Sequence, residues 1–313
     1  MFSSFFAKSK PINILLVAFL ISIVFVFTKF DHISANFSAY EILKQLGLLL
    51  TAIFSVFVLD FIIGKNNLTQ KNSYAILLFG LFITLIPKSI AQTNLLLSNL
   101  FILFALRRLI SLHSKLEIKK KLVDAAFWIG VASLFYFWSI LFFILILIAL
   151  LYYSQNDIKN WIIPFVALIV LALLVISYHI VFYDSYLPQE NFYPGLSFDF
   201  SSFKTYQSII KFLIIVVLTA IMSLFFIKTI SEKTNKIKPS YILIVIASVV
   251  AIAIEIIAPI KTGGELIFLF GPLAIMTATY LEKAQKKWVI DLLLVFLFLV
   301  SSTYLMLNFF TEG

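Results

Sequence analysis

Residues 122–153 read LVDAAFWIGVASLFYFWSILFFILILIALLYY, and the number of times this stretch crosses a membrane decides the fold of the whole chain. Asp124 is its only charged residue. The stretch is longer than the roughly 17–25 apolar residues of an ordinary membrane-spanning helix. It therefore forms either one long tilted helix or a hairpin of two short helices. Every later segment changes sides between these two arrangements.

The positions of the positive residues decide between the two. Loops on the cytoplasmic side of membrane proteins are enriched in Lys and Arg. With a hairpin and a cytoplasmic N-terminus, six clusters lie inside and hold most of the 24 Lys and Arg residues. A single crossing would place the last three clusters outside, so the sequence favours the hairpin. The clusters are Lys8/Lys10, Lys65/Lys71, Arg107 to Lys121, Lys159, Lys228 to Lys238 and Lys283/Lys286/Lys287.

The composition extends the membrane interpretation to the whole chain. Of 313 residues, 62% are hydrophobic and 12% are charged, and the mean hydropathy is +1.07. A soluble domain has about 25% charged residues, so most of this surface must face lipid. The net charge of +9 lies mainly in short loops, where it predicts contact with membrane lipids and not with nucleic acid.

We therefore predict an all-α, polytopic transmembrane bundle of about eleven spans, with the N-terminus inside and the C-terminus outside. The bundle forms a single integral-membrane domain, residues 1–313. We interpret the first apolar run as an uncleaved span, because it is longer than the core of a signal peptide. Besides the hairpin, the expected spans are Pro11–Phe27, Ile42–Ile63, Tyr74–Pro87, Leu95–Leu106, Trp161–Phe182, Ile209–Ile227, Tyr241–Pro259, Leu266–Leu281 and Trp288–Asn308.

Two connections differ in character. The expected outer loop Asp184–Gln207 is mildly acidic and rich in aromatic residues, which are typical of a segment lying in the membrane interface. The expected cytoplasmic loop Arg107–Lys121 is strongly basic. We interpret the basic loop as a determinant of orientation, with binding of a lipid phosphate as the alternative.

Ionisable side chains at membrane depth are costly and are therefore candidates for function. At the expected inner ends, Asp124 and Asp291 fit acids that stabilise helix N-termini, and Lys65 lies within reach of Asp60. The expected outer ends carry a larger set, which either converges on one site or consists of separate helix-end groups. That set is Asp31, His32, Lys88, Gln92, His179, Glu255, Lys261 and Glu265.

Residues 78–111 read LFGLFITLIPKSIAQTNLLLSNLFILFALRRLIS. A helix ends at Pro87, a short polar turn follows, and a second helix opens with Thr-Asn and closes with Arg-Arg. This hairpin resembles the corresponding one in GT-C-type integral-membrane glycosyltransferases, which take sugars from polyprenyl-phosphate donors. The short hairpin 124–153 and the tight Gly263-Gly264 turn before a Pro-containing span are also similar. The chain further resembles uncharacterised polytopic membrane proteins of flavobacteria.

The GT-C resemblance implies a GT-C-like arrangement and a site at the outer face of a bacterial cytoplasmic (inner) membrane. Asp31 would act there as general base or metal ligand, with a divalent metal as the implied cofactor. Lys88, Lys261 and His179 would hold the phosphate of a polyprenyl-phosphate-linked sugar, and Gln92, Glu255 and Glu265 would complete the substrate site.

Three functions remain open from the sequence. The first is a GT-C-like glycosyltransferase or an inactive relative. The second is a non-enzymatic scaffold that docks envelope proteins through its aromatic outer loop. The third is a transporter, for which Glu255 could carry protons. The almost wholly apolar stretches Leu48–Val58 and Val166–Ile176 argue against this third function, because transporter sites contain polar groups and broken helices near mid-membrane.

Overall fold

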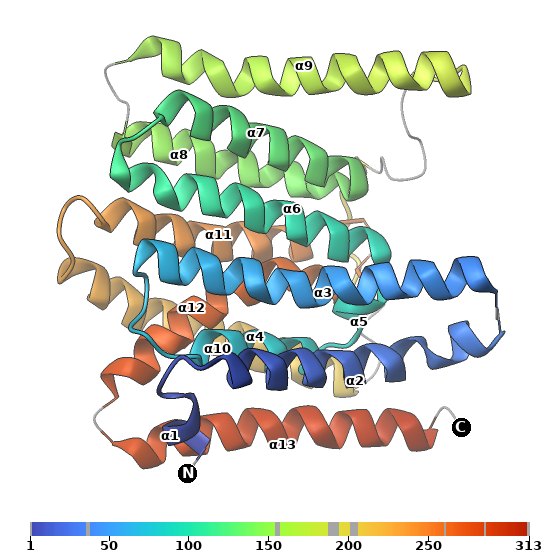
Figure 1. The fold of residues 1–313 in the computed structure, drawn as a ribbon, viewed down its shortest axis with the longest axis vertical. Coiled ribbons are helices and arrows are strands. Elements are labelled where there is room, and N and C mark those ends of the chain that lie inside the picture. Colours follow the sequence, from blue (N-terminus) through green and yellow to red (C-terminus); the bar gives the residue numbers. More distant parts are fainter. Residues whose placement is uncertain are drawn as a thin grey trace.

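The computed structural model describes residues 2–35, 38–153, 157–186, 194–200, 206–259, 261–284 and 286–311. All of them lie in helices or in the segments that connect helices (Figure 1). The elements, in chain order, are α1 (Phe2–Phe6), α2 (Pro11–Ala35), α3 (Ala39–Asn66), α4 (Tyr74–Leu85), α5 (Lys88–Ala91), α6 (Thr93–Ile110), η1 (Ser111–Ser114), α7 (Ile118–Phe135), η2 (Phe137–Phe142), α8 (Phe143–Tyr153), α9 (Ile158–Tyr183), α10 (Tyr206–Ser231), α11 (Lys238–Ile257), η5 (Gly264–Leu266), α12 (Ile267–Lys283) and α13 (Lys287–Thr311).

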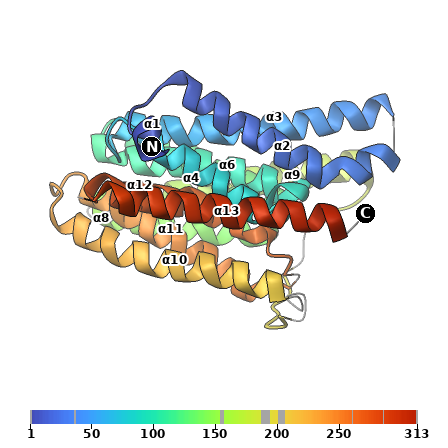
Figure 2. The ribbon, with the colours of Figure 1, turned by 90° about the horizontal axis from the view of Figure 1, so that it is seen from below.

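The long helices run side by side and form a stack, with α9 at one edge and α13 at the other (Figure 1). Helices α4 and α12 occupy its centre, and every residue of α4 is buried. Figure 2 shows α2 and α3 on one side of this pair and α10 and α11 on the other. Seven helices in the described residues are long and apolar enough to cross a membrane. The chain is thus a helical membrane protein, whereas the number of crossings and the orientation stay predictions.

Burial differs sharply between the centre and the edge of the stack. In α12, 94% of the most apolar window is buried, whereas none of the corresponding window of α9 is. Helix α9 packs on α7 and α8, and a Cβ on Gly130 of α7 would lie 2.4 Å from Leu171 Cδ2 of α9. The missing side chain thus lets α9 approach α7 closely, while its other faces remain available to lipid.

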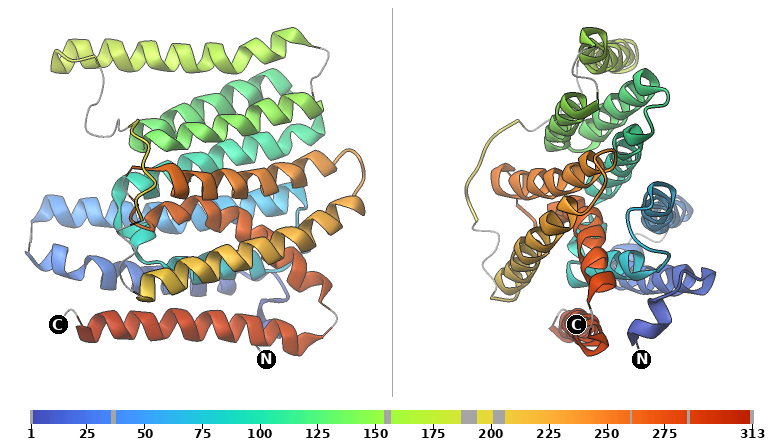
Figure 3. Two further views of the ribbon diagram at one scale, coloured as in Figure 1. Left: turned by 180° about the vertical axis from the view of Figure 1, so that it is seen from behind. Right: turned by 90° about the vertical axis from the view of Figure 1, so that its left-hand side faces the viewer.

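All six clusters of Lys and Arg lie at the same end of the stack, the left-hand end in Figure 1. We call it the basic end, and the other the opposite end. Helix α1 lies at the basic end and α13 runs toward the opposite end. Figure 3 includes a view along the helices from the basic end.

The apolar stretch 122–153 is broken into α7 and α8, which are joined by the 3₁₀-helix η2. At the start of this stretch, Lys121 Nζ donates a 2.7 Å hydrogen bond to the carbonyl of Ser111. At its end, the Tyr153 hydroxyl lies 3.2 Å from Ser240 Oγ, which itself donates to the carbonyl of Ile110 at 2.9 Å. Both ends therefore meet the end of α6. The segment enters and leaves at the basic end, as the hairpin hypothesis requires.

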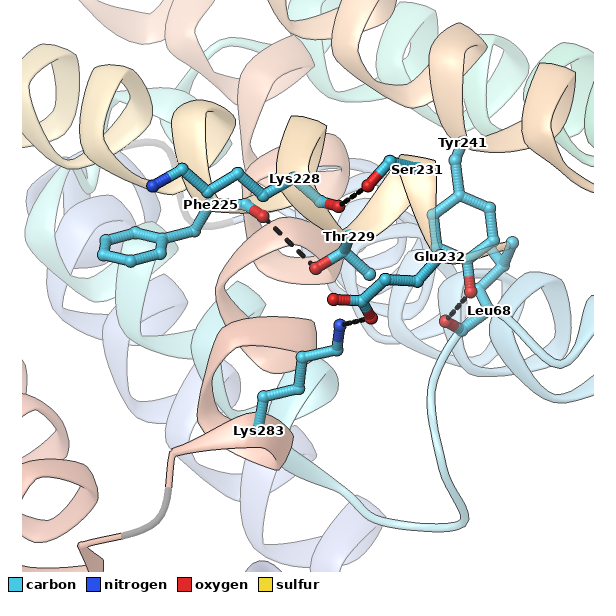
Figure 4. A network of polar contacts seen from close by, with 8 residues as sticks. All are labelled: Leu68, Phe225, Lys228, Thr229, Ser231, Glu232, Tyr241 and Lys283. Atoms are coloured by element: carbon cyan, nitrogen blue, oxygen red, sulfur yellow. Dashed lines mark hydrogen bonds and ion pairs between the residues drawn. The ribbon is translucent and has the colours of Figure 1, made fainter. Parts of the chain in front are cut away.

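The connection between α3 and α4 is a centre of polar contacts at the basic end. The buried Tyr241 hydroxyl donates a 2.6 Å hydrogen bond to the carbonyl of Leu68 (Figure 4). Glu282 accepts hydrogen bonds from the Gln70 amide at 2.9 Å and from the Asn72 side chain. These bonds fix α11 and α12 to a loop that lies far away in sequence. In the same view, Lys283 pairs with Glu232 across the ends of α12 and α10.

Two connections are more helical than the sequence suggests. Helix α2 continues to Ala35 and α3 begins at Ala39, so little remains of the connection expected between the spans Pro11–Phe27 and Ile42–Ile63. Residues 107–121 lie mostly in α6, η1 and α7 instead of in a loop. No proline or glycine interrupts these segments, so nothing local ends the helices earlier. Of the expected loop Asp184–Gln207, residues 187–193 and 201–205 lie outside the described residues.

The structure supports none of the three interpretations of the inner-end acids. Helix α7 has no acid in its first turn, and Asp124 instead forms a 2.8 Å ion pair with Arg108. Asp60 forms no ion pair within the described residues, with Lys65 or any other side chain. It lines a groove together with Arg107. Asp291 also lies beyond the first turn of its helix, α13. Helix-dipole stabilisation falls off within that turn and so does not explain these acids.

Candidate functional site

The turn between α11 and α12 brings three of the candidate residues together at the opposite end. Glu255 lies in the last turns of α11, and Lys261 and Glu265 follow within the turn. All three side chains are at most 2% exposed. They are thus not separate groups at a wet surface. They form one buried polar cluster, which we call the α11–α12 cluster.

Lys261 closes the end of α11. Its ammonium donates a 3.0 Å hydrogen bond to the carbonyl of Ala258 and another to the carbonyl of Ser197. It also lies 4.8 Å from the centre of the Phe200 ring, within the range of a cation–π contact. The Ser197 amide donates to the carbonyl of Ile257 at 3.2 Å. Lys261 therefore fastens the segment Pro194–Phe200 over the helix end, where a cation is favourable.

Glu265 has a structural role of its own. It accepts hydrogen bonds from the Thr262 amide at 3.1 Å and from the Thr262 hydroxyl at 2.9 Å. Thr262 Oγ1 in turn accepts a 3.1 Å bond from the Gly264 amide, and Gly263 takes the left-handed φ of 79° that the turn needs. The spacing Thr262-x-x-Glu265 before an apolar run is that of a capping box, so the sequence did contain a signal for this arrangement.

Glu255 is the anomalous member of the cluster. Its side chain is fully buried, and neither carboxylate oxygen has a hydrogen-bond partner in the described part of the chain. Its electrostatic neighbours are Glu265 and Lys261. An unpaired polar group in such a place costs several kcal/mol unless it gains a partner. Glu255 is therefore a group that a proton, a cation or a donor on a ligand would satisfy.

Tyr136 is the residue that sequence reasoning missed. It lies between α7 and η2, at the tip of the hairpin, and its ring packs 5.8 Å from that of Phe268. Its hydroxyl also lacks a partner among the described residues, and both Glu255 and Glu265 lie within electrostatic reach of it. The only signal in the sequence is its position at the break of the apolar stretch.

Lys88 stands beside this cluster, but not within it. Its side chain is exposed at the start of α5, while its carbonyl lies 3.0 Å from the place a Cβ on Gly264 would take. Lys211, in the second turn of α10, is in electrostatic contact with Lys88. The α4–α6 connection, the α11–α12 turn and α10 therefore meet here. Gln92 ends α5 in the same region and is half-buried.

Three candidates are not brought to this place by described contacts. His179 lies near the end of α9, where its Nδ1 is 3.3 Å from Ser185 Oγ and its ring packs 5.3 Å from Tyr183. Because α9 is at the edge of the stack (Figure 1), His179 belongs to a separate aromatic cluster. Asp31 and His32 lie in α2, and their side chains are outside the described residues.

A metal site is not visible in what the structure describes. Among the described residues, no group of three or more His, Cys, Asp or Glu side chains lies close enough to hold a metal ion. The α11–α12 cluster offers two carboxylates, of which Glu265 is already occupied by Thr262. A divalent metal would need a further ligand, such as Asp31.

The comparisons with known proteins give a family but no function. No curated protein and no solved structure matches the chain significantly. One family model, described as a family of unknown function, matches residues 4–311. Because this match covers nearly the whole chain, the protein belongs to the family DUF6427.

Proposed function

We propose that the protein binds the phosphate of a polyprenyl-phosphate-linked sugar at the opposite end of the bundle, as a GT-C-like glycosyltransferase or an inactive relative of one. One observation carries this proposal: Lys88 and Lys211, from elements far apart in sequence, are electrostatic neighbours, and the Lys88 backbone packs against the turn of the α11–α12 cluster. Two neighbouring ammonium groups repel each other, and an anion between them removes that repulsion. A lipid phosphate supplies such an anion at the membrane interface.

The surroundings favour a lipid-linked ligand over a free one. Lys88 lies at the end of a bundle whose outer faces are apolar, with Asn94 exposed beside it at the start of α6. A polyprenyl chain can lie against such apolar faces, while its phosphate reaches the two lysines. Glu255 and Tyr136, whose side-chain oxygens have no hydrogen-bond partner among the described residues, would then be the partners for sugar hydroxyls.

The remaining roles follow the GT-C resemblance. Asp31 is the proposed general base or metal ligand for the acceptor, and a divalent metal is the proposed cofactor. The basic end faces the cytoplasm by the positive-inside rule, so the site faces outward. The proposed location is a bacterial inner membrane.

Binding of a synthetic polyprenyl monophosphate to the purified protein in nanodiscs tests this function. We expect Lys88→Ala and Lys211→Ala each to weaken binding by about tenfold, the effect of one charge-assisted contact. Lys44→Ala is the matched control, because Lys44 lies near the start of α3 at the same end and its ion pair within the described part of the chain is with Glu41. Equal binding by all three variants would overturn the proposal.

Catalysis is tested separately. If the protein transfers the sugar, Asp31→Asn should abolish transfer and leave polyprenyl-phosphate binding intact. If the protein is an inactive relative, the wild type itself should bind the polyprenyl phosphate without transferring a sugar. Full transfer activity in Asp31→Asn would remove Asp31 from the mechanism.

A second function, a scaffold for envelope proteins, is favoured by one surface. Leu196 and Phe198 are 65% and 69% exposed in the segment Pro194–Phe200, which lies at the opposite end. Large exposed apolar side chains outside a helix are typical of a docking surface. Proteins that co-purify with the wild type and are lost from Phe198→Ser would favour this function; an unchanged set of proteins would count against it.

A further inference from the structure

A groove between α3 and α6 near the basic end contains two opposite charges. It has a volume of about 440 Å³ and is lined by Phe54, Phe57, Val58, Asp60, Phe61, Phe104 and Arg107. Asp60 lies six residues before the end of α3 and Arg107 three before the end of α6. At 1.5 Å per residue, both lie within roughly 10 Å of the basic end, the depth at which lipid headgroups meet acyl chains.

The two charged side chains line the same groove without neutralising each other. No ion pair joins Asp60 to Arg107, and Asp60 has no hydrogen bond in the described part of the chain. Arg107 instead lies 4.5 Å above the Phe61 ring. Arg108, its neighbour, is already paired with Asp124 at 2.8 Å. The groove therefore presents one available guanidinium and one available carboxylate between aromatic walls.

We propose that this groove is a binding site for a phospholipid with a zwitterionic ethanolamine headgroup. The phosphate would pair with the Arg107 guanidinium, whose planar fork suits phosphate oxygens. The ammonium would donate hydrogen bonds to the Asp60 carboxylate. The acyl chains would lie along Phe54, Phe57 and Phe104, of which Phe54 and Phe57 are 48% and 45% exposed.

The two charges discriminate between headgroups. A phosphatidylglycerol headgroup has a phosphate for Arg107 but no cation for Asp60. A choline headgroup has a cation but no N–H donor, so it leaves the half-buried carboxylate without hydrogen bonds. Of these three headgroups, only ethanolamine brings both a phosphate for Arg107 and a cation with N–H donors for Asp60. This site is at the basic end, away from the α11–α12 cluster, and does not depend on the proposed function.

Native mass spectrometry of the protein with equimolar ethanolamine, choline and glycerol phospholipids tests the site. We expect the wild type to retain the ethanolamine lipid preferentially. Asp60→Asn should reduce its preference over the glycerol lipid by about tenfold, the effect of one hydrogen bond to a charged group. Arg107→Gln should reduce retention of both lipids, and Arg107→Lys should restore part of it.

Matched controls separate a site from a general charge effect. Lys65→Gln and Glu117→Gln remove one charge of each sign at the same end, outside the groove. Equal retention of the three lipids by the wild type would overturn the proposal. So would a control that changes the preference as much as Asp60→Asn or Arg107→Gln does. Asp60 and Arg107 are both partly exposed, so the neutral variants should fold, which gel filtration checks.

Discussion

Replacing Gly264 by alanine should loosen the contact between the α11–α12 turn and α5. A Cβ at this position would lie 3.0 Å from the Lys88 carbonyl oxygen, 3.0 Å from Leu95 Cδ1 and 3.1 Å from Thr262 Oγ1. The tip of Leu95 can rotate away. The carbonyl belongs to the backbone at α5, and Thr262 Oγ1 is held by Glu265 and by the Gly264 amide. Relief therefore requires the turn and α5 to move apart by a few tenths of an ångström.

The expected cost follows from this geometry. Insertion of a methyl group into packed surroundings costs about 1–3 kcal/mol. Gly47→Ala is the matched control, because Gly47 lies inside α3 with nothing within 4 Å of the added Cβ. Alanine in such a helical position should stabilise the protein by about 0.5–1 kcal/mol.

Thermal unfolding of the two variants in the same detergent, followed by Trp fluorescence, measures this difference. We expect Gly264→Ala to lower the unfolding midpoint by about 2–6 °C, at roughly 2 °C per kcal/mol for a chain of this size. Gly47→Ala should leave the midpoint unchanged or raise it. If Gly264→Ala unfolds at or above the wild-type midpoint, the close packing of the turn against α5 is refuted. If Gly47→Ala lowers the midpoint as much, the effect is not specific to the turn.

Four further variants test individual groups and contacts. Glu255→Gln replaces a buried carboxyl group that has no hydrogen-bond partner among the described residues, and it should leave the unfolding midpoint equal or higher. A lower midpoint would reveal a bond that the carboxyl group makes. Lys261→Met should speed hydrogen–deuterium exchange at the Ser197 amide, measured by mass spectrometry, and unchanged exchange would exclude Lys261 as its anchor. Tyr241→Phe should lower the free energy of unfolding by about 1 kcal/mol, because it removes a buried hydrogen bond. Glu232→Gln should lower it by about 0–1 kcal/mol, because its ion pair is exposed. Chemical denaturation measures both, and a larger loss in Glu232→Gln than in Tyr241→Phe would contradict this assignment.

The helical membrane character could be predicted from the sequence because its cause is local. Long apolar stretches must close their backbone hydrogen bonds internally, so they form helices. The break within residues 122–153 has no proline to mark it, yet the Lys and Arg clusters predict an even number of crossings there. The ends of helices were harder to predict. Helix α2 continues through Asp31 to Ala35, because a polar residue does not stop a helix that has reached water.

The candidate site could be predicted only in part, for a physical reason. Lys261 and Glu265 lie close together because one short turn joins them. The position of Tyr136 near this turn depends on which helices are neighbours. Hydropathy does not reveal neighbours, because lipid-facing and buried side chains of a membrane helix are equally apolar. His179 shows the same limit, since nothing in the apolar pattern of α9 reveals that this helix lies at the edge of the stack.

The return of α7 and α8 to the end from which they started has a consequence for how such a chain can change. A paired segment of this kind adds two membrane crossings or none. Its gain or loss therefore does not change whether the number of crossings in the chain is odd or even. Every later loop would keep its side, and with it the polar groups at each face. Loss of a single helix would instead invert everything that follows, including α11, α12 and the turn between them. The hairpin is therefore an element that could have been acquired without rebuilding the rest of the protein.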